Sequence, residues 1–377
     1  MGFDEIALPL WREFRDRFPV TNNLIYLNHA AVAPLPRPCA EAMQGWAGDA
    51  MEYGSLHYDQ WLDAYEGLRV AAARLIGAER GEIAMIKNTS EGIATVAMGL
   101  NWRPGDKIVA FREEFPANYY PWLRLGSERC MVVWLSVTDS LDAIDRACRG
   151  AKLLAISFVQ YLSGLRVDLN AIGEICRRRG CFFFVDAIQG MGAFPLDVRA
   201  AHIDALAADG HKWMLGPEGC GILYVRKERQ DSIFPEEFGW TNVAGYNDYA
   251  SRDMALRPDA GRYECGTLNT IGCFGLRASI ELILEVGVER IGPVVQALAG
   301  QLAEGAVNKG YQLLGERTGE NGSGIIALNK AGVDSRKIVW DLKDRGIVAA
   351  PRQGFVRFSP HFYVSPEEIE RVVEELP

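Results

Sequence analysis

The chain has 377 residues, of which 49% are hydrophobic and 24% are charged. These proportions are typical of soluble globular proteins and exclude disorder over most of the length, while the length predicts one large domain and a smaller one. The net charge of -9 and the isoelectric point near 5.3 argue against nucleic acid and membrane as partners. No apolar run approaches the ~20 residues of a membrane helix, and residues 1–19 are too acidic for a signal peptide.

The eight cysteines are scattered along the chain, and none forms a C-x-x-C pair. Most of them have apolar or glycine neighbours, as buried free thiols do. Neither a disulfide framework nor a zinc site is expected, and no other metal is expected. This cysteine usage predicts a protein of a reducing compartment, the cytoplasm.

Short apolar runs alternate with helical periods from residue 82 onwards. A helix is expected at 168–180, with Asp168 as its N-cap and Gly180 as its stop. Strand, helix and strand in repetition predict an α/β domain with a mainly parallel sheet. The expected strands are 82–86, 106–111, 131–137, 152–159, 181–186, 203–209 and 220–225.

The pattern changes around Gly275, where two long helices are expected at 274–291 and 291–310. A loop at 317–324 and alternating strands and helices follow, which predict a second, smaller α+β domain. The expected organisation is an N-terminal arm over 1–25, a large domain over 26–274 and a small C-terminal domain over 275–377.

Polar residues follow two of the expected strands, where an open parallel sheet binds its ligands. Thr89 and Ser90 open a helix, and hydroxyls and free N–H groups at a helix N-terminus suit a phosphate. The alternative is an ordinary Ser/Thr N-cap. Asp186 ends the apolar run 181–186, and a buried carboxylate needs a cationic or hydrogen-bonding partner. The alternative for Asp186 is a helix cap or a structural ion pair.

Lys212 stands between His211 and Trp213 before a glycine-rich turn, which is an unusual setting for a surface lysine. Together with Asp186 and the Thr89 region it describes a phosphate cradle, a buried anion and an amine of lowered pKa. Pyridoxal 5′-phosphate needs all three: a phosphate site, an acid on the pyridinium nitrogen and a Schiff-base lysine.

Three segments then resemble a family. "VDAIQGMGAFPLDV" (185–198), "ADGHKWMLGPEGCGILYV" (208–225) and "YECGTLN" (263–269) are similar to class V aminotransferase proteins of pyridoxal-phosphate fold type I. This group includes cysteine desulfurases and isopenicillin N epimerase-like proteins. The resemblance runs from "YLNHAAVAPLP" (26–36) to "VRFSPHFYVSPEEI" (356–369) and implies a mainly parallel mixed sheet with a small C-terminal α+β domain.

The resemblance also implies roles for the cofactor-binding residues. Lys212 forms the Schiff base, Asp186 pairs with the pyridinium nitrogen, and Gln189 approaches the phenolic oxygen of the cofactor. Phe115 stacks on the cofactor ring, with packing in the core as its alternative. The phosphate is held by Thr89, Ser90 and His211, and by Gly266 and Thr267 of a partner subunit, which implies a homodimer.

The substrate residues are implied in the same way. Arg357 binds the substrate carboxylate as a bidentate pair, and Arg352 is a neighbouring candidate whose alternative is a solvated loop charge. Asn28 and His29 are expected at the substrate entrance.

Three departures from the family pattern matter. Desulfurases carry a nucleophilic cysteine on a loop before the carboxylate-binding arginine, and no cysteine follows Cys273 here. Phe115 also stands where desulfurases have a histidine. Asp209 replaces a small hydroxyl residue near the phosphate, so we expect its carboxylate to turn away or to meet a cation.

These residues predict an aminotransferase that acts on a small amino acid through Lys212. A lyase, a racemase or an epimerase shares every step up to deprotonation of the substrate Cα and stays open as an alternative. A non-catalytic protein that binds pyridoxal phosphate is the third interpretation, and the set of Lys212, Asp186 and Arg357 argues against it.

Overall fold

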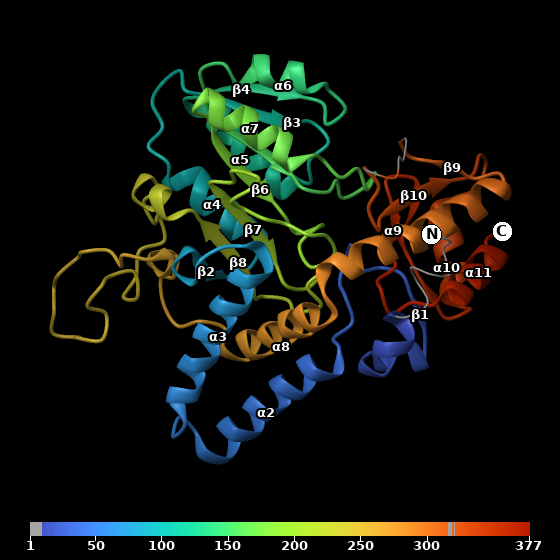
Figure 1. Cartoon of the computed structure of the whole chain (residues 1–377), viewed down its shortest axis with the longest axis horizontal. Helices are drawn as coiled ribbons and strands as arrows, with labels where there is room; N and C mark the ends of the chain where they lie inside the picture. The colour runs from blue at the N-terminus through green and yellow to red at the C-terminus, as the bar shows by residue number, and fades with distance from the viewer. Residues whose placement is uncertain (1–9, 316–318, 320) are drawn as a thin grey trace.

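The computed structural model describes residues 10–315, 319 and 321–377, so part of the expected loop at 317–324 and the first residues of the arm lie outside it. A large α/β domain lies beside a smaller domain (Figure 1). The large domain is built on a seven-stranded sheet with the order β2-β8-β7-β6-β5-β3-β4. The strands are β2 (Ile83–Ile86), β3 (Lys107–Phe111), β4 (Met131–Leu135), β5 (Ala151–Ser157), β6 (Phe182–Asp186), β7 (Ala205–Asp209) and β8 (Gly221–Val225).

The predicted, mainly parallel sheet is confirmed. β3 to β7 run parallel, and β8 runs antiparallel to both of its neighbours, β7 and β2. β2 therefore points the same way as the parallel strands. The carboxyl ends of six strands meet at one edge of the sheet, which is where ligands bind in folds of this kind.

The sheet is buried on both faces, which explains the continuous apolar run at 181–186. Phe182 and Phe184 of β6 pack with α4 (Thr89–Gly99) and α5 (Tyr120–Glu128) on one face. Phe183 and Val185 pack on the other face with α6 (Leu141–Cys148) and α7 (Leu169–Arg179). α7 is the helix expected at 168–180, and it has the predicted Asp168 cap and Gly180 stop.

The two long helices expected after residue 274 are α8 (Thr270–Val286) and α9 (Val288–Asn308), which meet at Gly287 rather than at residue 291. α8 packs against the hairpin of α2 (Arg37–Tyr53) and α3 (Tyr58–Ile76), whereas α9 packs against α11 (Pro366–Glu375). In the structure the large domain thus continues through α8, beyond the expected boundary at 275. None of the helices in the described ranges combines the length and the apolar character of a membrane span.

The small domain contains a four-stranded antiparallel sheet with the order β12-β13-β10-β9. A turn of two residues, Gln353 and Gly354, joins β12 to β13, with φ angles of 48° and 85°. The turn leaves no room for a long loop between these strands. The elements are β9 (Gln312–Leu313), β10 (Ile326–Asn329), α10 (Ser335–Lys343), β12 (Ala350–Arg352) and β13 (Phe355–Phe358).

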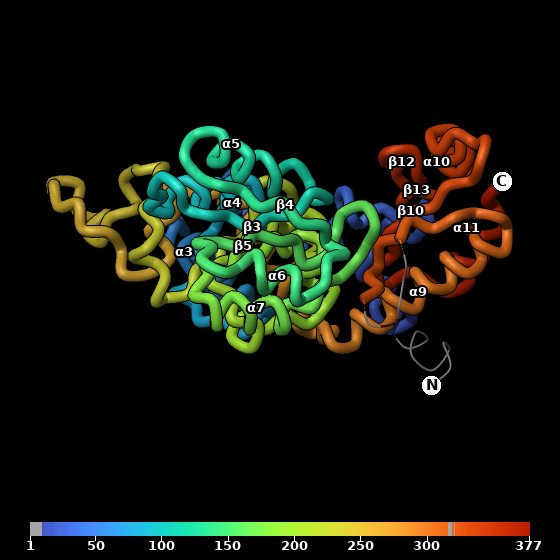
Figure 2. The backbone as a smooth tube through the Cα atoms, turned by 90° about the horizontal axis from the view of Figure 1, so that it is seen from above, coloured from blue at the N-terminus to red at the C-terminus, as the bar shows by residue number. Residues whose placement is uncertain are grey.

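The N-terminal segment packs on the small domain, although the rest of that domain comes from the C-terminal part of the chain. β1 (Ile25–Tyr26) pairs in parallel with β11 (Ile347–Val348). Arg15 binds both carboxylate oxygens of Glu368 at 2.8 Å. Figure 2 shows the blue N-terminal segment within the red domain, beside the large domain.

A buried histidine, His29, holds this junction together. Its Nδ1 lies 2.8 Å from the carbonyl oxygen of Ser359 and its Nε2 lies 2.7 Å from the hydroxyl of Tyr363. Because a carbonyl oxygen only accepts, Nδ1 carries the proton and Nε2 accepts from Tyr363. Burial lowers the pKa of His29 to about 4, so the ring is neutral.

The buried His29 makes the free energy of unfolding depend on pH. The folded-state pKa of His29 lies below its unfolded value, so unfolded chains bind the proton more readily as the pH falls. The contribution of His29 is fully present above about pH 6.5 and is lost as the pH falls to about 4. A difference of roughly 2.5 pKa units corresponds to about 3 kcal/mol in the free energy of unfolding. Urea unfolding between pH 7.5 and 4.5 measures this loss.

The variant His29→Gln does not titrate in this range. It is expected to be less stable than the wild type at pH 7.5 and to lose less stability on acidification. His57→Gln is the control: His57 is half-buried between α2 and α3, and since glutamine can still donate to Asp49, the variant is expected to keep close to the wild-type stability at pH 7.5. Equal losses of unfolding free energy in His29→Gln and the wild type would contradict the assignment.

Candidate active site

A cavity of about 330 Å³ opens at the carboxyl edge of the large sheet and is closed from the other side by β12 and β13 of the small domain. It brings together residues that are far apart in the sequence. Most of the residues expected from the sequence line it: Thr89, Ser90, Phe115, Asp186, Gln189, His211, Lys212, Arg352 and Arg357.

Asp186 supplies a buried carboxylate at the end of β6, the central strand of the sheet. Its side chain is 2% exposed, and the backbone N–H of Ile188 donates to its Oδ1 at 3.1 Å. Burial raises the pKa of Asp186 to about 6, against the opposing effects of this hydrogen bond and of the charge on Lys212. A carboxylate in this setting is stabilised by any proton or cation that enters the cavity.

Lys212 supplies a buried amine from the connection between β7 and β8. Its Nζ lies 5.8 Å from the centre of the Phe115 ring and interacts electrostatically with Asp186. Burial lowers the pKa of Lys212 to about 8, and the positive charges of Arg357 and Arg352 act in the same direction. A neutral amine, the nucleophilic form, is therefore accessible near neutral pH.

The first turn of α4 lines the cavity through Thr89 and Ser90. Asn88, and not Thr89 or Ser90, caps the helix, because its Oδ1 accepts from the N–H of Glu91 at 2.9 Å. The ordinary N-cap alternative for Thr89 and Ser90 is therefore wrong. The Thr89 hydroxyl accepts from the N–H of Asp209 at 2.9 Å, which ties α4 to the end of β7. The N-terminus of α4 thus offers an anion site inside the cavity.

Asp209 meets an imidazole. One of its carboxylate oxygens lies 3.1 Å from His211 Nδ1, and the Asp209 side chain is 5% exposed. The expectation that Asp209 turns away or meets a cation is thus explained by His211, the residue expected beside the phosphate. The two side chains lie in contact, although their geometry is not that of a hydrogen bond.

Gln189 and Phe115 lie on the walls of the cavity. The amide of Gln189 donates to the carbonyl of Ala30 at 3.0 Å and accepts from Trp213 Nε1 at 2.9 Å, which fixes both ends of the side chain. Phe115 is 46% exposed and its ring packs edge-on against Tyr161 at 5.3 Å. Packing in the core, the alternative for Phe115, is therefore wrong.

Two arginines enter from the small domain on the opposite side. Arg357 is 2% exposed, and one Nη donates to the carbonyl of Tyr161 at 2.7 Å. Burial and the charge of Arg352 lower the pKa of Arg357 to about 10, which still leaves it charged at neutral pH. Among the described residues the bonded partners of both arginines are backbone carbonyls and not carboxylates. An anion that enters this part of the cavity meets two cations.

One buried acid of this region, Glu114, was not expected from the sequence. Its carboxylate accepts from the Ser157 N–H at 2.7 Å, from the Ser157 hydroxyl and from the Gln160 amide at 3.2 Å. Burial raises the pKa of Glu114 to about 7. Ser157 lines the cavity and is the register partner of Asp186. Glu114 therefore anchors the turn that carries Phe115 to the end of β5.

Four of the expected residues lie outside the cavity. His29 is fully buried in the domain junction, and Asn28 is half-buried beside it, with a backbone bridge to Ser359. The structure therefore does not bring these two to a substrate entrance. Gly266 is half-buried and Thr267 is exposed, away from the cavity of their own chain.

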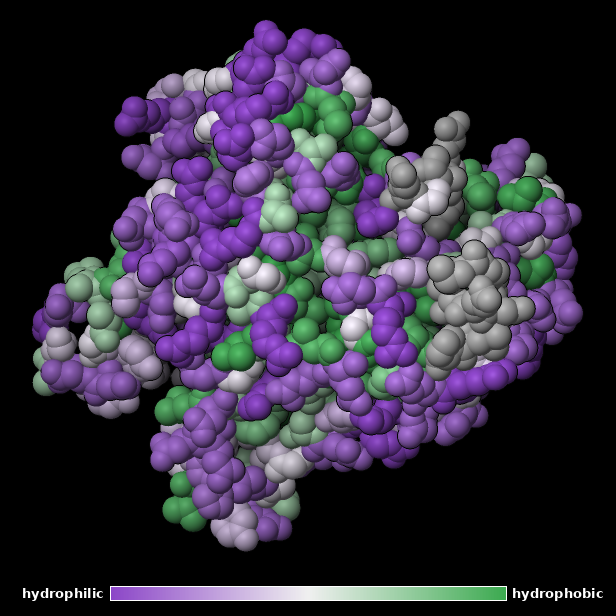
Figure 3. Space-filling model, viewed as in Figure 1, coloured by the Kyte–Doolittle hydropathy of each residue, from purple (hydrophilic) through white to green (hydrophobic). Residues whose placement is uncertain are grey.

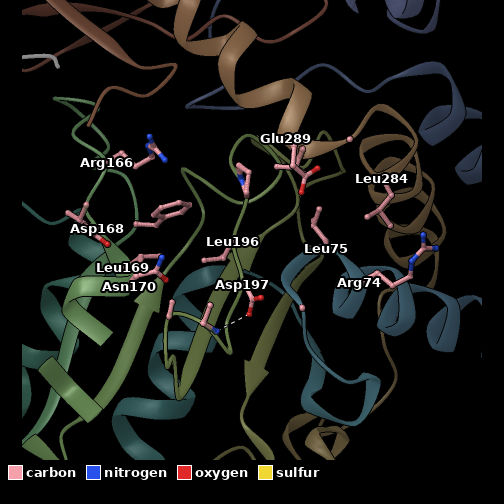
Figure 4. A pocket seen from close by; sticks show the side chains of 18 of the residues that line it. Arg74, Leu75, Arg166, Asp168, Leu169, Asn170, Leu196, Asp197, Leu284 and Glu289 are labelled. Carbon is pink, nitrogen blue, oxygen red and sulfur yellow. Dashed lines mark hydrogen bonds between the residues drawn. The ribbon is translucent and has the colours of Figure 1, made fainter. Parts of the chain in front are cut away.

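Two larger cavities contain neither Lys212 nor Asp186 among the described residues that line them. One, of about 800 Å³, has Asp168 and Asp197 in its wall (Figure 4). Asp168 caps α7 through the N–H of Ala171, and Asp197 accepts from the backbone N–H groups of Arg199 and Ala200. Both carboxylates therefore stabilise the local backbone through hydrogen bonds. The other, of about 1050 Å³, shares Tyr161 with the cavity that contains Lys212.

Comparisons with known proteins agree with this arrangement. The family model "Aminotransferase class-V" matches residues 25–372. The chain is 31% identical to a "Probable cysteine desulfurase" of Pyrococcus abyssi, over 97% of each chain. It is 28% identical to the "Uncharacterized aminotransferase YcbU" of Bacillus subtilis, over 97% of this chain and 96% of that one.

A solved structure has the same fold. The apo cysteine desulfurase of Thermococcus onnurineus superposes with a TM-score of 0.89 at 29% identity, over 96% of each chain. The predicted fold type I architecture is thereby confirmed. The relatives carry both desulfurase and aminotransferase names. Membership of the family therefore does not specify a single reaction. The chain belongs to the class V aminotransferase family of enzymes that depend on pyridoxal 5′-phosphate.

Proposed function

We propose that this enzyme is an aminotransferase that acts on a small amino acid, with Lys212 as the residue that bonds to the cofactor and moves the proton. The observation that carries the proposal is the placement of Lys212. Its buried amine, with a pKa lowered to about 8, lies between the carboxylate of Asp186 and two arginines of the small domain.

The cavity fits pyridoxal phosphate on its own chemistry. Asp186 is a buried acid that lacks a bonded cationic side chain in the described chain, and a protonated ring nitrogen supplies that partner. The α4 N-terminus with Thr89 and Ser90 suits the phosphate. Phe115 offers a partly exposed ring as a stacking surface.

The bound cofactor supplies an electron sink for negative charge at the substrate Cα. The chain's own residues do the rest. Asp186 holds the proton on the ring nitrogen, since a buried carboxylate is favoured only beside a positive charge. Lys212 Nζ accepts and returns a proton, because its pKa of about 8 lies close to the operating pH of most enzymes.

The substrate half of the cavity supports an amino acid of limited size. The guanidinium of Arg357 presents donors in a fixed fork that matches a carboxylate, and Arg352 adds a second positive charge. A volume of about 330 Å³ is at the lower end of ligand sites, which typically measure ~300–1000 Å³. Once the cofactor fills its part, the room that remains suits a short side chain.

A substrate panel tests the proposal. The holoenzyme is incubated with single amino acids, with and without pyruvate or 2-oxoglutarate, and all products are identified. Transfer of the amine that requires the keto acid is the expected result. Products that form equally well without a keto acid would show lysis or epimerisation instead. No product from any amino acid would contradict an enzymatic function at this cavity.

Lys212 is expected to carry the cofactor. Borohydride reduction of the holoenzyme followed by peptide mapping should place the pyridoxyl group on Lys212. Lys212→Ala should lose the reducible bond and at least ~100-fold in turnover, since a positioned acid-base group contributes 10²–10⁴-fold. Lys87→Ala is the matched control, because Lys87 lies near the α4 N-terminus but pairs with Glu91 at the surface. Label on any other lysine would end the assignment.

Sulfur chemistry is not part of the proposed function, although several relatives are named desulfurases. Desulfuration needs a thiolate that reaches the substrate, and no cysteine lines the cavity in the described chain. The turn Gln353–Gly354 joins β12 directly to β13, where no loop carries such a thiol. Phe115 lacks the acid-base group that an imidazole would supply.

We therefore expect negligible persulfide formation from L-cysteine. Alanine and sulfide release are measured with the same holoenzyme preparation that transfers amines. Cys265 is the one cysteine that is more than marginally exposed in the described chain, so Cys265→Ser is the informative variant. Robust sulfide release that disappears in Cys265→Ser would overturn this expectation.

The proposed active unit is a homodimer. Exposed apolar side chains, including Met51 and Leu56, lie at the end of the α2–α3 hairpin. Figure 3 shows some green, hydrophobic atoms among purple ones at this lower end of the molecule. A second group lies on the projecting segment 234–258, where Trp240 packs edge-on against Tyr249 at 6.1 Å. Trp240 also lies beside Gly266, so this surface continues to Thr267. A partner that covers it would bring Thr267 towards a second cavity.

Sedimentation is expected to give twice the chain mass of 41.7 kDa. Trp240→Glu should shift the protein towards the monomer and weaken cofactor binding, because a buried charge opposes association. Trp340→Glu is the control, since Trp340 is also an exposed tryptophan but lies on α10 of the small domain. A fully active wild-type monomer would contradict the proposal.

A further inference from the structure

Three thiols that are scattered in the sequence lie together in the fold. Cys148 ends α6, Cys176 belongs to α7 and Cys181 immediately precedes β6. The three Sγ atoms all lie within 4.8 Å of one another. Each side chain is at most 2% exposed. This thiol cluster lies at the start of β6, and Asp186 lies at the far end of the same strand.

Local geometry explains why the three meet. α7 stops at Gly180, whose φ of 65° is the left-handed conformation that favours glycine, and the N–H of Cys181 then bonds back to the carbonyl of Cys176 at 2.9 Å. The turn therefore sets Cys181 beside Cys176. α6 packs against α7 on the same face of the sheet and adds Cys148 from its last turn.

We propose that the thiol cluster binds one soft divalent d10 metal ion through three thiolates. Metal–sulfur bonds of about 2.3 Å set three sulfurs around one ion roughly 4 Å apart. The three Sγ atoms, already within 4.8 Å, need only small side-chain rotations to reach this spacing. Thiolate is the ligand that selects soft ions over Mg²⁺ or Ca²⁺.

The charge balance favours a divalent ion. One M²⁺ and three thiols give a tris-thiolate complex of charge -1 and release three protons. Lys107 and Arg179 interact electrostatically with Cys148 and favour its thiolate, whereas Asp145, which pairs with Arg179, acts against it. A monovalent ion would leave -2 in a buried site, which is more costly.

The thiol cluster offers a bound ion three ligands. Among the described residues no histidine or carboxylate joins the three sulfurs as a fourth ligand. A structural zinc site has four protein ligands. The thiol cluster therefore suits an ion that accepts three thiolates, as Cd²⁺ does. Because the ligands come from α6, α7 and the start of β6, a bound ion would tie these three elements together and stabilise the fold.

Cd²⁺ is the probe for the test, with the reduced holoenzyme in the background Cys265→Ser to remove the half-buried thiol. One equivalent is expected to bind with a cadmium–thiolate absorption in the ultraviolet, to release three protons, and to raise the melting temperature. Cys148→Ala, Cys176→Ala and Cys181→Ala should each weaken binding more than ~100-fold, since loss of even an outer partner of a metal site costs 10–100-fold.

Cys220→Ala is the matched control. Cys220 is equally buried, and its Sγ lies 3.9 Å from that of Cys273, but this pair lacks a third thiol in its group. X-ray absorption of the wild-type cadmium complex, which needs no variant to fold, should count three sulfur ligands. The proposal is overturned if no Cd²⁺ binds at micromolar concentration, if the spectrum counts other than three sulfurs, or if Cys220→Ala abolishes binding while Cys176→Ala keeps it. The three thiols would then be packing side chains.

Discussion

A carboxylate buried at the centre of the molecule is the constraint around which the site is arranged. Asp186 ends the central strand of a sheet that is covered on both faces, and its side chain is 2% exposed. Removing an ionised carboxylate from water costs several kcal/mol unless positive charge or donors replace the water. The backbone N–H of Ile188 replaces part of it. The proposed function assigns the remaining demand for positive charge to a cationic cofactor ring.

The positive charges of the site come from two domains. Lys212 belongs to the large sheet, whereas Arg352 and Arg357 belong to β12 and β13 of the small domain. Their separation across the cavity is therefore set by how the two domains meet. His29 and Tyr363 lie where the domains meet. There the backbone carbonyl of Trp213, the neighbour of Lys212, accepts a hydrogen bond from His361 Nε2 at 3.3 Å. The small domain thus acts as a wall of the site, and its position determines where Arg352 and Arg357 lie in the cavity.

Much of the large domain could be predicted from the sequence because its strands are continuous apolar runs, such as 181–186. Since ligands bind at the carboxyl ends of parallel strands, the sequence also predicts that Thr89, Asp186 and Lys212 share one site. Glu114 could not be found in this way, because its role depends on the pairing of Ser157 with Asp186. The position of His29 could not be predicted either, because its partner Ser359 lies 330 residues further along the chain.

The thiol cluster is a second feature that could not be predicted from the sequence. Cysteine spacing reveals a metal site only when the ligands lie close in the sequence, as in C-x-x-C pairs. Here packing of α6 on α7 brings Cys148 to Cys176, and this contact leaves no trace in the spacing.

The pairing of β1 with β11 has a consequence for synthesis. Ile25 has its partner at Ile347, so the first strand of the protein is made long before the residue that it pairs with. At ~5–20 residues per second, a ribosome needs roughly 15–60 s to cover that interval. Throughout this time Phe14 and Phe18 lack the aromatic rings of Phe362 and Tyr363 that bury them in the finished fold. The apolar side chains of the N-terminal segment therefore stay without these partners until residues 362 and 363 have been synthesised.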